Sequence, residues 1–202
     1  EANTASGAYS LILGGEDNAA SGVHAVVLGG QSNRASGAGS VAAGQSAHAV
    51  HDGTFLWSDG SSKNGLNSDA ANQFKVRATG GIIFETGSDG VAARLTENSG
   101  SWAHVSDRSK KTGFTDLSSE RILEKINKMP INTWEYIGNS KARHMGPYAQ
   151  DFHALFKLGD NPREISVVDA DGIKLLGIQG LAAIEMIHRG IKSGLETTQQ
   201  QL

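Results

Sequence analysis

The feature that most constrains this chain is a repeat of fifteen residues near its N-terminus. The triplet Ala-Ser-Gly recurs at residues 5–7, 20–22 and 35–37, and each triplet is followed by an alternating apolar pattern. A period of two in the apolar positions predicts a β-strand with one face inward. A unit this short has no core of its own, so its coils must cover one another in a stack. The repeat therefore predicts a β-solenoid. The alternating pairs are Leu11 and Leu13, Val26 and Leu28, and Val41 and Ala43.

Other positions recur with the same period. Gly14-Gly15 and Gly29-Gly30 follow the predicted strands and indicate turns, while Asn18 and Asn33 are expected at turn or ladder positions. His48 interrupts the asparagine series, and by Asp52 the sequence repeat has faded. The inward positions are mostly small, so the coils of one chain enclose little apolar volume. We therefore expect a segment of an oligomeric fibre.

Residues 3–50 resemble the head repeats of trimeric autotransporter adhesins, the YadA-like left-handed β-roll, in which the phrases SxxLGG and NxASG recur. The resemblance implies a homotrimer. Two interpretations of the outer surface remain open: the coils form a plain shaft, or their exposed side chains bind a host receptor or glycan. The exposed candidates are Glu16, Asp17, His24, Gln31 and Arg34.

The rest of the chain predicts a change of architecture near residue 105. We expect three regions: β-roll repeats over 1–50, a β-rich connector over 51–105, and a small α+β domain over 106–202 ending in a coiled-coil helix. Strands are expected at 55–57, 74–77, 82–84, 131–137 and 165–168, with an exposed loop over 58–69 and a turn over 169–172. Helices are expected from Ser118 or Ser119 to Pro130, from Gly146-Pro147 onward with the proline in the first helical position, and from near Leu175.

Composition excludes several classes of function. The chain of 202 residues carries a net charge of −3, so no basic surface for nucleic acid is predicted. It has no cysteine, which excludes disulfides and thiolate metal sites, and no apolar run long enough for membrane insertion. No metal or cofactor is predicted. Because Glu1 falls inside an ongoing repeat, the chain is expected to be a fragment of a longer protein.

The hexapeptide SDRSKK, residues 106–111, is the candidate reactive element. It places the hydroxyl of Ser106 five residues before the amine of Lys111 and four before that of Lys110. A serine needs a base to become nucleophilic, and a lysine serves as that base when burial disfavours its charged form. Taken alone, such a pair is more typical of a solvated surface loop.

The stretch from Ser106 onward resembles the intramolecular chaperone domain of phage endosialidases and other tail-fibre proteins, the peptidase S74 family. The resemblance covers nearly all of residues 106–191 in the same order. It is carried by Ser106-Asp107-Arg108 with Lys111 and Phe114, the segment 123–130, Trp134-Glu135-Tyr136, the run 144–152 with its GPxAQDF phrase, the acidic stretch 169–172, and the Ile178-Gln179-Gly180-Leu181 helix.

This resemblance implies a domain that trimerises, helps the preceding fibre fold, and then cuts itself off before the motif serine. Carried over, the scissile bond is Val105–Ser106, Ser106 is the nucleophile and Lys111 is the general base, in a single-turnover serine peptidase. Lys110 stands one residue short of the family position. The chain departs from the family pattern at Gly113, where Asn or Asp is usual. Candidate supporting residues are Asp107, His144, Gln150 and Asp151; helix capping or packing explains those in the motif equally well.

Two function hypotheses follow. In the first, the chain is the C-terminal part of a fibre or adhesin whose chaperone domain drives trimerisation and then self-cleaves. In the second, the same fold stays attached as a structural tip or adhesin head that binds a host receptor or glycan. Both place the protein outside the cell, on a phage virion tail fibre or a bacterial surface.

Overall fold

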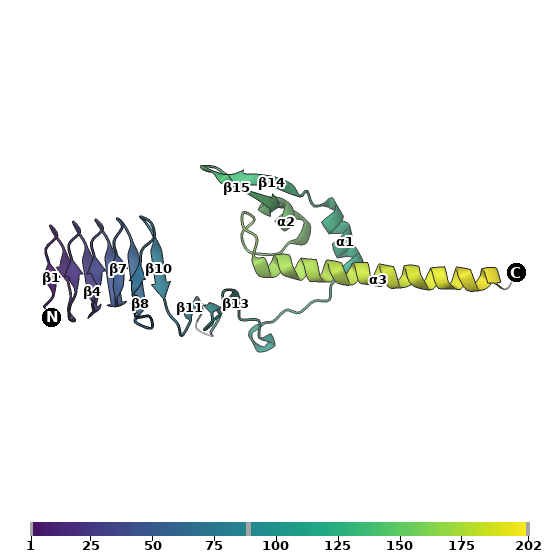
Figure 1. Cartoon of the computed structure of the whole chain (residues 1–202). Coiled ribbons are helices and arrows are strands. Elements are labelled where there is room, and N and C mark those ends of the chain that lie inside the picture. The colour runs from purple at the N-terminus through teal and green to yellow at the C-terminus, as the bar shows by residue number, and fades with distance from the viewer. Residues whose placement is uncertain (1, 88–89, 201–202) are drawn as a thin grey trace. The chain divides into compact units, whose positions relative to one another are not determined.

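The structure, a computed structural model, describes residues 2–87 and 90–200, except for the side chains of Ser140 and of residues 197–200. The chain divides into two compact units, Glu1–Thr112 and Gly113–Leu202. Figure 1 shows the first unit as a stack of short strands and the second as a group of helices with one hairpin. Each unit is described by itself.

The first unit begins with a β-solenoid of about five turns, as the repeat predicted. Its strands form two sheets of five, and every pair of neighbouring strands is parallel. One sheet has the order β1 (Thr4–Ala5), β3 (Ala19–Ala20), β5 (Arg34–Ala35), β7 (Ala47–Ala49) and β9 (Leu66–Asn67). The other contains β2 (Leu11–Ile12), β4 (Val26–Gln31), β6 (Val41–Gln45), β8 (Phe55–Asp59) and β10 (Phe74–Arg77).

The core between the two sheets is made of small side chains. Val27 and Leu56 are the largest apolar residues that are fully buried, and most of the others are alanines. This agrees with the small inward residues of the repeat. Each coil contributes so little apolar area that its stability depends on the coils above and below it. The fully buried alanines are Ala20, Ala25, Ala35, Ala42, Ala47 and Ala49.

A ladder of buried asparagines connects successive coils. The Asn33 backbone N–H donates to Asn18 Oδ1 at 3.0 Å, and the Ala47 N–H donates to Asn33 Oδ1 at 2.9 Å. The Asn33 side-chain amide also donates to the carbonyl of Gly44 at 2.7 Å. The sequence predicts that His48 is the residue at which this ladder is interrupted, and the prediction is wrong by one position along the chain. Ala47 takes the ladder position, because the step between coils shortens there from fifteen residues to fourteen.

The coils continue after the recognisable sequence repeat has ended. β8 and β10 extend the second sheet in register, with Val41 opposite Phe55 and Phe55 opposite Phe74. The step between coils lengthens to nineteen residues between His48 and Asn67. The expected exposed loop over 58–69 is therefore wrong in part, because it contains β9 and the buried residues Ser58, Leu66 and Ser68.

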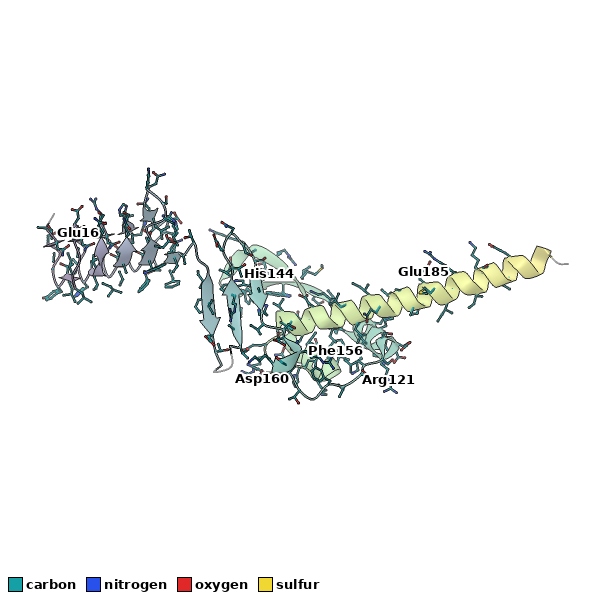
Figure 2. All side chains as sticks on the ribbon, turned by 90° about the horizontal axis from the view of Figure 1, so that it is seen from below. Glu16, Arg121, His144, Phe156, Asp160 and Glu185 are labelled. Carbon is teal, nitrogen blue, oxygen red and sulfur yellow. The ribbon has the colours of Figure 1, made fainter. Side chains whose placement is uncertain are left out.

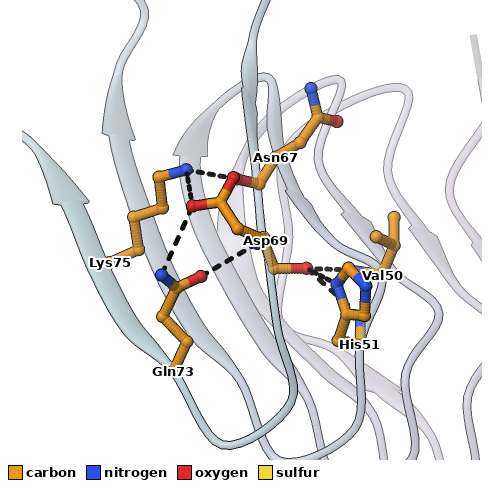
Figure 3. A network of polar contacts seen from close by, with 7 residues as sticks. Val50, His51, Asn67, Asp69, Gln73 and Lys75 are labelled. Atoms are coloured by element: carbon orange, nitrogen blue, oxygen red, sulfur yellow. Dashed lines mark hydrogen bonds and ion pairs between the residues drawn. The ribbon is translucent and has the colours of Figure 1, made fainter. Parts of the chain in front are cut away.

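A polar network holds the longer coil in place (Figure 3). The Ser68 hydroxyl accepts hydrogen bonds from the backbone N–H groups of Val50 and His51, at 3.0 and 3.2 Å. Lys75 Nζ donates to the Asn67 carbonyl at 2.8 Å and to Asp69 Oδ2 at 2.6 Å. The hydrogen bond from Lys75 lowers the pKa of Asp69. These contacts replace the asparagine ladder where the sequence period is lost.

The first unit ends in a three-stranded antiparallel sheet with the order β11–β12–β13. Its strands are β11 (Ile82–Glu85), β12 (Ala92–Leu95) and β13 (Trp102–His104). Trp102 lies in β13, and its ring centroid is 5.8 Å from that of Phe84 on β11. Figure 1 shows this sheet directly after the coils.

The second unit packs two short helices against the start of a long one. It contains α1 (Ser119–Lys128), the antiparallel hairpin β14 (Asn132–Tyr136) and β15 (Asn139–Gly146), α2 (Ala149–Phe156) and α3 (Val167–Gln200). Ser118 caps α1 as predicted, because its hydroxyl accepts from the Arg121 N–H at 3.2 Å. The buried core consists of Ile122 from α1, Phe152 and Phe156 from α2, and Ile173 from α3; Phe156 is labelled in Figure 2.

Two expectations about helix starts were wrong. Residues 165–168 do not form a strand and 169–172 do not form a turn, because α3 already begins at Val167. The β-branched residues of 165–168 favour a strand. Burial of Ile173 in the core and an acidic residue in the first turn of α3 favour the helix, and these two effects outweigh the strand preference. Pro147 precedes the α2 N-cap residue, Tyr148, instead of occupying the first helical position. Gly190 and Gly194 lie within the continuous α3.

Two glycines of α3 lie close to α1. A Cβ at Gly177 would lie 2.7 Å from Ile126 Cδ1, and one at Gly180 would lie 2.7 Å from Leu123 Cδ1, so these side chains would have to shift. From Leu175 onward α3 also carries an exposed apolar series. Between these positions lie polar pairs such as Glu185, labelled in Figure 2, which accepts from Arg189 Nε at 2.7 Å. The exposed apolar residues are Leu175, Ile178, Leu181, Ile184, Ile187, Ile191 and Leu195.

Coil stacking generates the first prediction. A methyl group at Gly22 would overlap the Gly37 carbonyl of the next coil, whereas one at Gly14 would meet nothing within 4 Å. We expect Gly22→Ala to lower the free energy of unfolding by roughly 1–3 kcal/mol, because an overpacked coil must shift. Gly14→Ala should change it by less than about 0.5 kcal/mol. Urea unfolding followed by circular dichroism measures both; equal effects of the two substitutions would contradict the stacking argument.

Candidate active site

The loop that follows β13 forms a single turn. After His104 the Val105 N–H donates to the Ala92 carbonyl at 3.4 Å, and this is the last backbone contact to β12. The chain then enters the 3₁₀ turn η1 (Arg108–Lys110). The Lys110 N–H donates to the Asp107 carbonyl and the Lys111 N–H to the Arg108 carbonyl, both at 3.1 Å. This turn folds the hexapeptide back on itself.

The turn brings Ser106 and Lys111 into direct contact. Lys111 Nζ donates to Ser106 Oγ at 2.6 Å, a short hydrogen bond between residues five apart in sequence. Lys111 itself has extended backbone angles, φ −127° and ψ 151°, which direct the chain away from the turn. The sequence places two amines, those of Lys110 and Lys111, near this hydroxyl, and in the structure Lys111 forms the hydrogen bond.

Asp107 stabilises the turn as its N-cap. Its Oδ1 accepts the Ser109 N–H at 2.8 Å. The hydrogen bond from this backbone N–H holds the pKa of Asp107 below its usual range. Asp107 is therefore a local support of the Ser106–Lys111 contact, because it shapes the turn between the two residues.

The pair lies beside an open depression of about 470 Å3. Its lining consists of Val91, from the segment before β12, and the four residues Ser109, Lys110, Lys111 and Thr112. Ser106 and Lys111 are both exposed in the single chain, and Val105 is half-buried. A hydroxyl and an amine at 2.6 Å can exchange a proton directly.

The other candidate residues belong to the second unit, where each has a local role. His144, labelled in Figure 2, lies on β15 and stacks on Trp134 with ring centroids 4.7 Å apart. Its ring also meets Tyr136 edge-on at 5.5 Å. Gln150 and Asp151 lie in the first turn of α2, where the Asp151 carboxylate favours the positive end of the helix dipole. The compact group around Ser106 thus consists of Ser106, Asp107 and Lys111.

Sequence reasoning missed two residues from the start of β12 that lie beside the loop. The Ala92 carbonyl accepts the N–H of Val105, just before the hexapeptide, and Val91 lines the same depression as Lys111 at its end. Neither residue type suggests a functional role. The pairing that brings them there joins β12 to β13 across a turn, so no spacing rule within the hexapeptide points to it.

Residues 2–87 and 90–200 lack the features of two other kinds of site. Among these residues no three or more His, Asp or Glu side chains are gathered in a way that would hold a metal ion. No helix in the described part of the chain is both long and apolar enough to cross a membrane.

Comparison with known proteins identifies one family. Residues 106–158 match the family model of the chaperone of endosialidase, peptidase S74. The match begins at Ser106, the residue predicted to follow the scissile bond, so the resemblance seen in the sequence is confirmed for this stretch. The five-turn solenoid is consistent with a β-roll head. No curated protein and no solved structure matches the chain.

The Asp107 cap generates a prediction that can be tested without a cleavage reaction. Because the pKa of Asp107 is lowered in the folded loop, its hydrogen bond to Ser109 is present above the ordinary carboxyl value of 3.8 and is lost as the pH falls through a lower midpoint. The amide NMR signal of Ser109 should therefore titrate with a midpoint below 3.8. In Asp107→Asn, which also caps, this titration should vanish while the signal stays near its high-pH position; a midpoint above 3.8 would contradict the cap.

Proposed function

We propose that the chain is the C-terminal part of a trimeric fibre or adhesin whose chaperone domain, residues 106–202, drives trimerisation and then cuts the Val105–Ser106 bond. The 2.6 Å contact between Lys111 Nζ and Ser106 Oγ is the observation that carries this proposal. The family match that begins at the same serine supports it. The fibre part, residues 1–105, would comprise the β-roll of 1–50, its further coils to Arg77, and the connector that ends in β13.

The proposed reaction needs no cofactor. The neutral amine of Lys111 takes the proton of Ser106 Oγ, and the oxygen attacks the carbonyl carbon of Val105. The C–N bond then breaks, the leaving nitrogen of Ser106 receives the proton from Lys111, and Val105 is held as an ester. Water hydrolyses the ester to a carboxylate on Val105 and restores the hydroxyl. Because nucleophile and carbonyl are neighbours in one chain, the entropy of bringing them together is already lost.

Assembly into a trimer would supply the desolvated surroundings that Ser106 and Lys111 lack in the single chain. Ser106 and Lys111 are exposed in one chain, whereas a base lysine needs a desolvated environment. We infer that neighbouring copies cover the loop, which would make cleavage a late step that follows trimer formation. Removal of the chaperone afterwards would leave the fibre kinetically trapped in its assembled state.

Exposed apolar surface supports a trimer in both units. On the solenoid, Leu13 is 63% exposed and Phe74 67% exposed, and Leu11, Leu28 and Trp57 add to the apolar surface of the same sheet. On α3 the exposed apolar series from Leu175 to Leu195 steps by three or four residues. Monomeric proteins rarely leave contiguous apolar surfaces of this kind in water.

An adhesin head that stays attached is the second candidate. The observation that favours it is an aromatic pair on the outer edge of the coils: the Tyr9 side chain is 84% exposed and stacks on His24 with ring centroids 5.0 Å apart. Such a pair is suited to contact a receptor or the apolar face of a sugar. In either case the protein would act outside the cell, on a virion tail fibre or a bacterial surface.

Self-cleavage generates the main prediction. Wild-type chain should yield two fragments, 1–105 and 106–202, while Ser106→Ala and Lys111→Ala should remain whole. Lys110→Ala is the matched control and should still cut, since Lys111 is the lysine that contacts the serine. Denaturing gels and the intact masses of the fragments measure the outcome.

The same assay tests the base and the alternative. Cleavage should speed up as the pH rises, because only a neutral amine accepts the serine proton. A wild-type chain that stays whole after prolonged incubation would favour the attached tip or head; Gly113→Asn, which restores the usual family residue at a position with φ +67°, is then the first variant to try. Cleavage that persists in Lys111→Ala would show that another group is the base.

The exposed series on α3 generates a prediction about assembly. In a Ser106→Ala background, which keeps the domain attached, Ile184→Asp should shift the chain from trimer to monomer by burying a charge in the seam. Gln179→Asp adds the same charge at an exposed position outside the apolar series and should leave the trimer intact. Light scattering at micromolar concentration measures both masses. A wild-type monomer would contradict the proposed trimer.

A further inference from the structure

The strand before the proposed scissile bond is part of the fibre sheet. β13 pairs with β12 in antiparallel register, with Trp102 opposite Leu95 and His104 opposite Ala93. The pairing continues one step beyond the strand, because the Val105 N–H donates to the Ala92 carbonyl at 3.4 Å. The peptide group on the N-terminal side of the bond is therefore held by a sheet that belongs to residues 82–104.

An aromatic contact ties this strand to the far side of the sheet. The Trp102 ring lies 5.8 Å from the Phe84 ring at an interplanar angle of 42°, so the first residue of β13 contacts β11 across β12. β11 and β12 are joined in turn by their own register, Phe84 opposite Ala93. Aromatic pairs of this kind contribute about 0.5–1.5 kcal/mol beyond the area they bury. Trp102 thus fixes the end of β13 opposite the scissile bond.

The segment at the start of β12 contacts both halves of the cleavage loop. Ala92 accepts the Val105 N–H, and its neighbour Val91 lines the depression that contains Lys111. Val91 is itself fixed, because its carbonyl accepts the Thr86 N–H at 3.1 Å. Ala92 therefore holds the backbone N–H of the residue whose carbonyl would be attacked, and its neighbour Val91 lines the same depression as the amine that would take the proton.

We propose that the three-stranded sheet β11–β12–β13 is the positioning element for self-cleavage, with Trp102 and Phe84 as its positioning residues. This inference rests on the proposed self-cleavage. It makes the reaction depend on the fold of the fibre: when β13 leaves the sheet, the Val105 carbonyl loses its fixed place relative to Ser106 Oγ. A chain whose last fibre sheet has not formed keeps its chaperone attached.

The test compares two ring variants with a matched control on the same strand. Trp102→Ala and Phe84→Leu each remove the ring contact, and we expect cleavage to slow at least about tenfold, since small displacements of reacting groups cost rate steeply. Ile83→Ala removes an apolar side chain from β11 that is 56% exposed, close to the 53% of Phe84, and should cut at the wild-type rate. Trp102→Phe keeps a ring and should restore most of the rate.

Three readouts separate positioning from a general loss of structure. The pH profile of the slowed variants should keep its wild-type shape, because the base is unchanged. In the uncleaved Ser106→Ala chain, adding Trp102→Ala should leave the oligomeric mass and the circular dichroism unchanged. Hydrogen exchange of the Val105 amide should be faster in that double variant than in Ser106→Ala alone.

The outcomes distinguish this inference from the function on which it rests. Wild-type cleavage with unchanged rates in both Trp102→Ala and Phe84→Leu would overturn the positioning role and leave the self-cleavage proposal standing. Equal slowing by Ile83→Ala would also overturn it, by showing that the effect is not specific to the ring contact. Absence of cleavage in the wild type would overturn both.

Discussion

The contact between one coil and the next is the constraint on which the first unit depends. Parallel strands stack at about 4.8 Å, so the backbones of successive coils approach too closely for a side chain at some positions. Gly22 lies at such a position, against the carbonyl of Gly37. The buried amides of Asn18 and Asn33 provide the complementary polar contact, because they form hydrogen bonds with backbone groups of the next coil. Close backbone approaches require glycine in each coil of the repeat, and backbone groups between these coils require an asparagine partner once per coil. Both requirements therefore impose the same period on the sequence.

The solenoid does not require that period to remain constant. Its register survives a step of fourteen residues and then one of nineteen, because the extra chain is placed outside the sheets. The hydroxyl of Ser68 and the Lys75–Asp69 pair bond the backbone of the longer coil. The parallel pairing of the strands continues, and their residues change from alanine and valine to Phe55, Leu56 and Phe74. The larger side chains appear where the polar ladder stops.

The candidate active site lies where two kinds of structure meet along the chain. The Ser106–Lys111 contact is made by a short turn that Asp107 caps, while the backbone N–H of Val105, the residue before Ser106, donates to the carbonyl of Ala92 in the three-stranded sheet. Both ends of the loop belong to the same compact unit, Glu1–Thr112, although the family match starts at Ser106. The family match begins at the proposed scissile bond, whereas the boundary by packing follows Thr112, so the two divisions of the chain differ by a few residues.

The sequence by itself determined the solenoid, the capped helix α1 and the candidate pair of Ser106 and Lys111, because each depends on local spacing: fifteen residues per coil, Ser118 before an apolar stripe, and Ser106 five residues before Lys111. Only the tertiary structure decided where the coils end, since their later steps follow packing and not a repeat. It also decided that α3 begins at Val167, where burial of Ile173 in the helical core outweighs a β-branched pattern. The contact of Ala92 could not be predicted from the sequence either. Its backbone carbonyl meets the Val105 N–H because β12 pairs with β13, and residue type does not encode such non-local strand pairing.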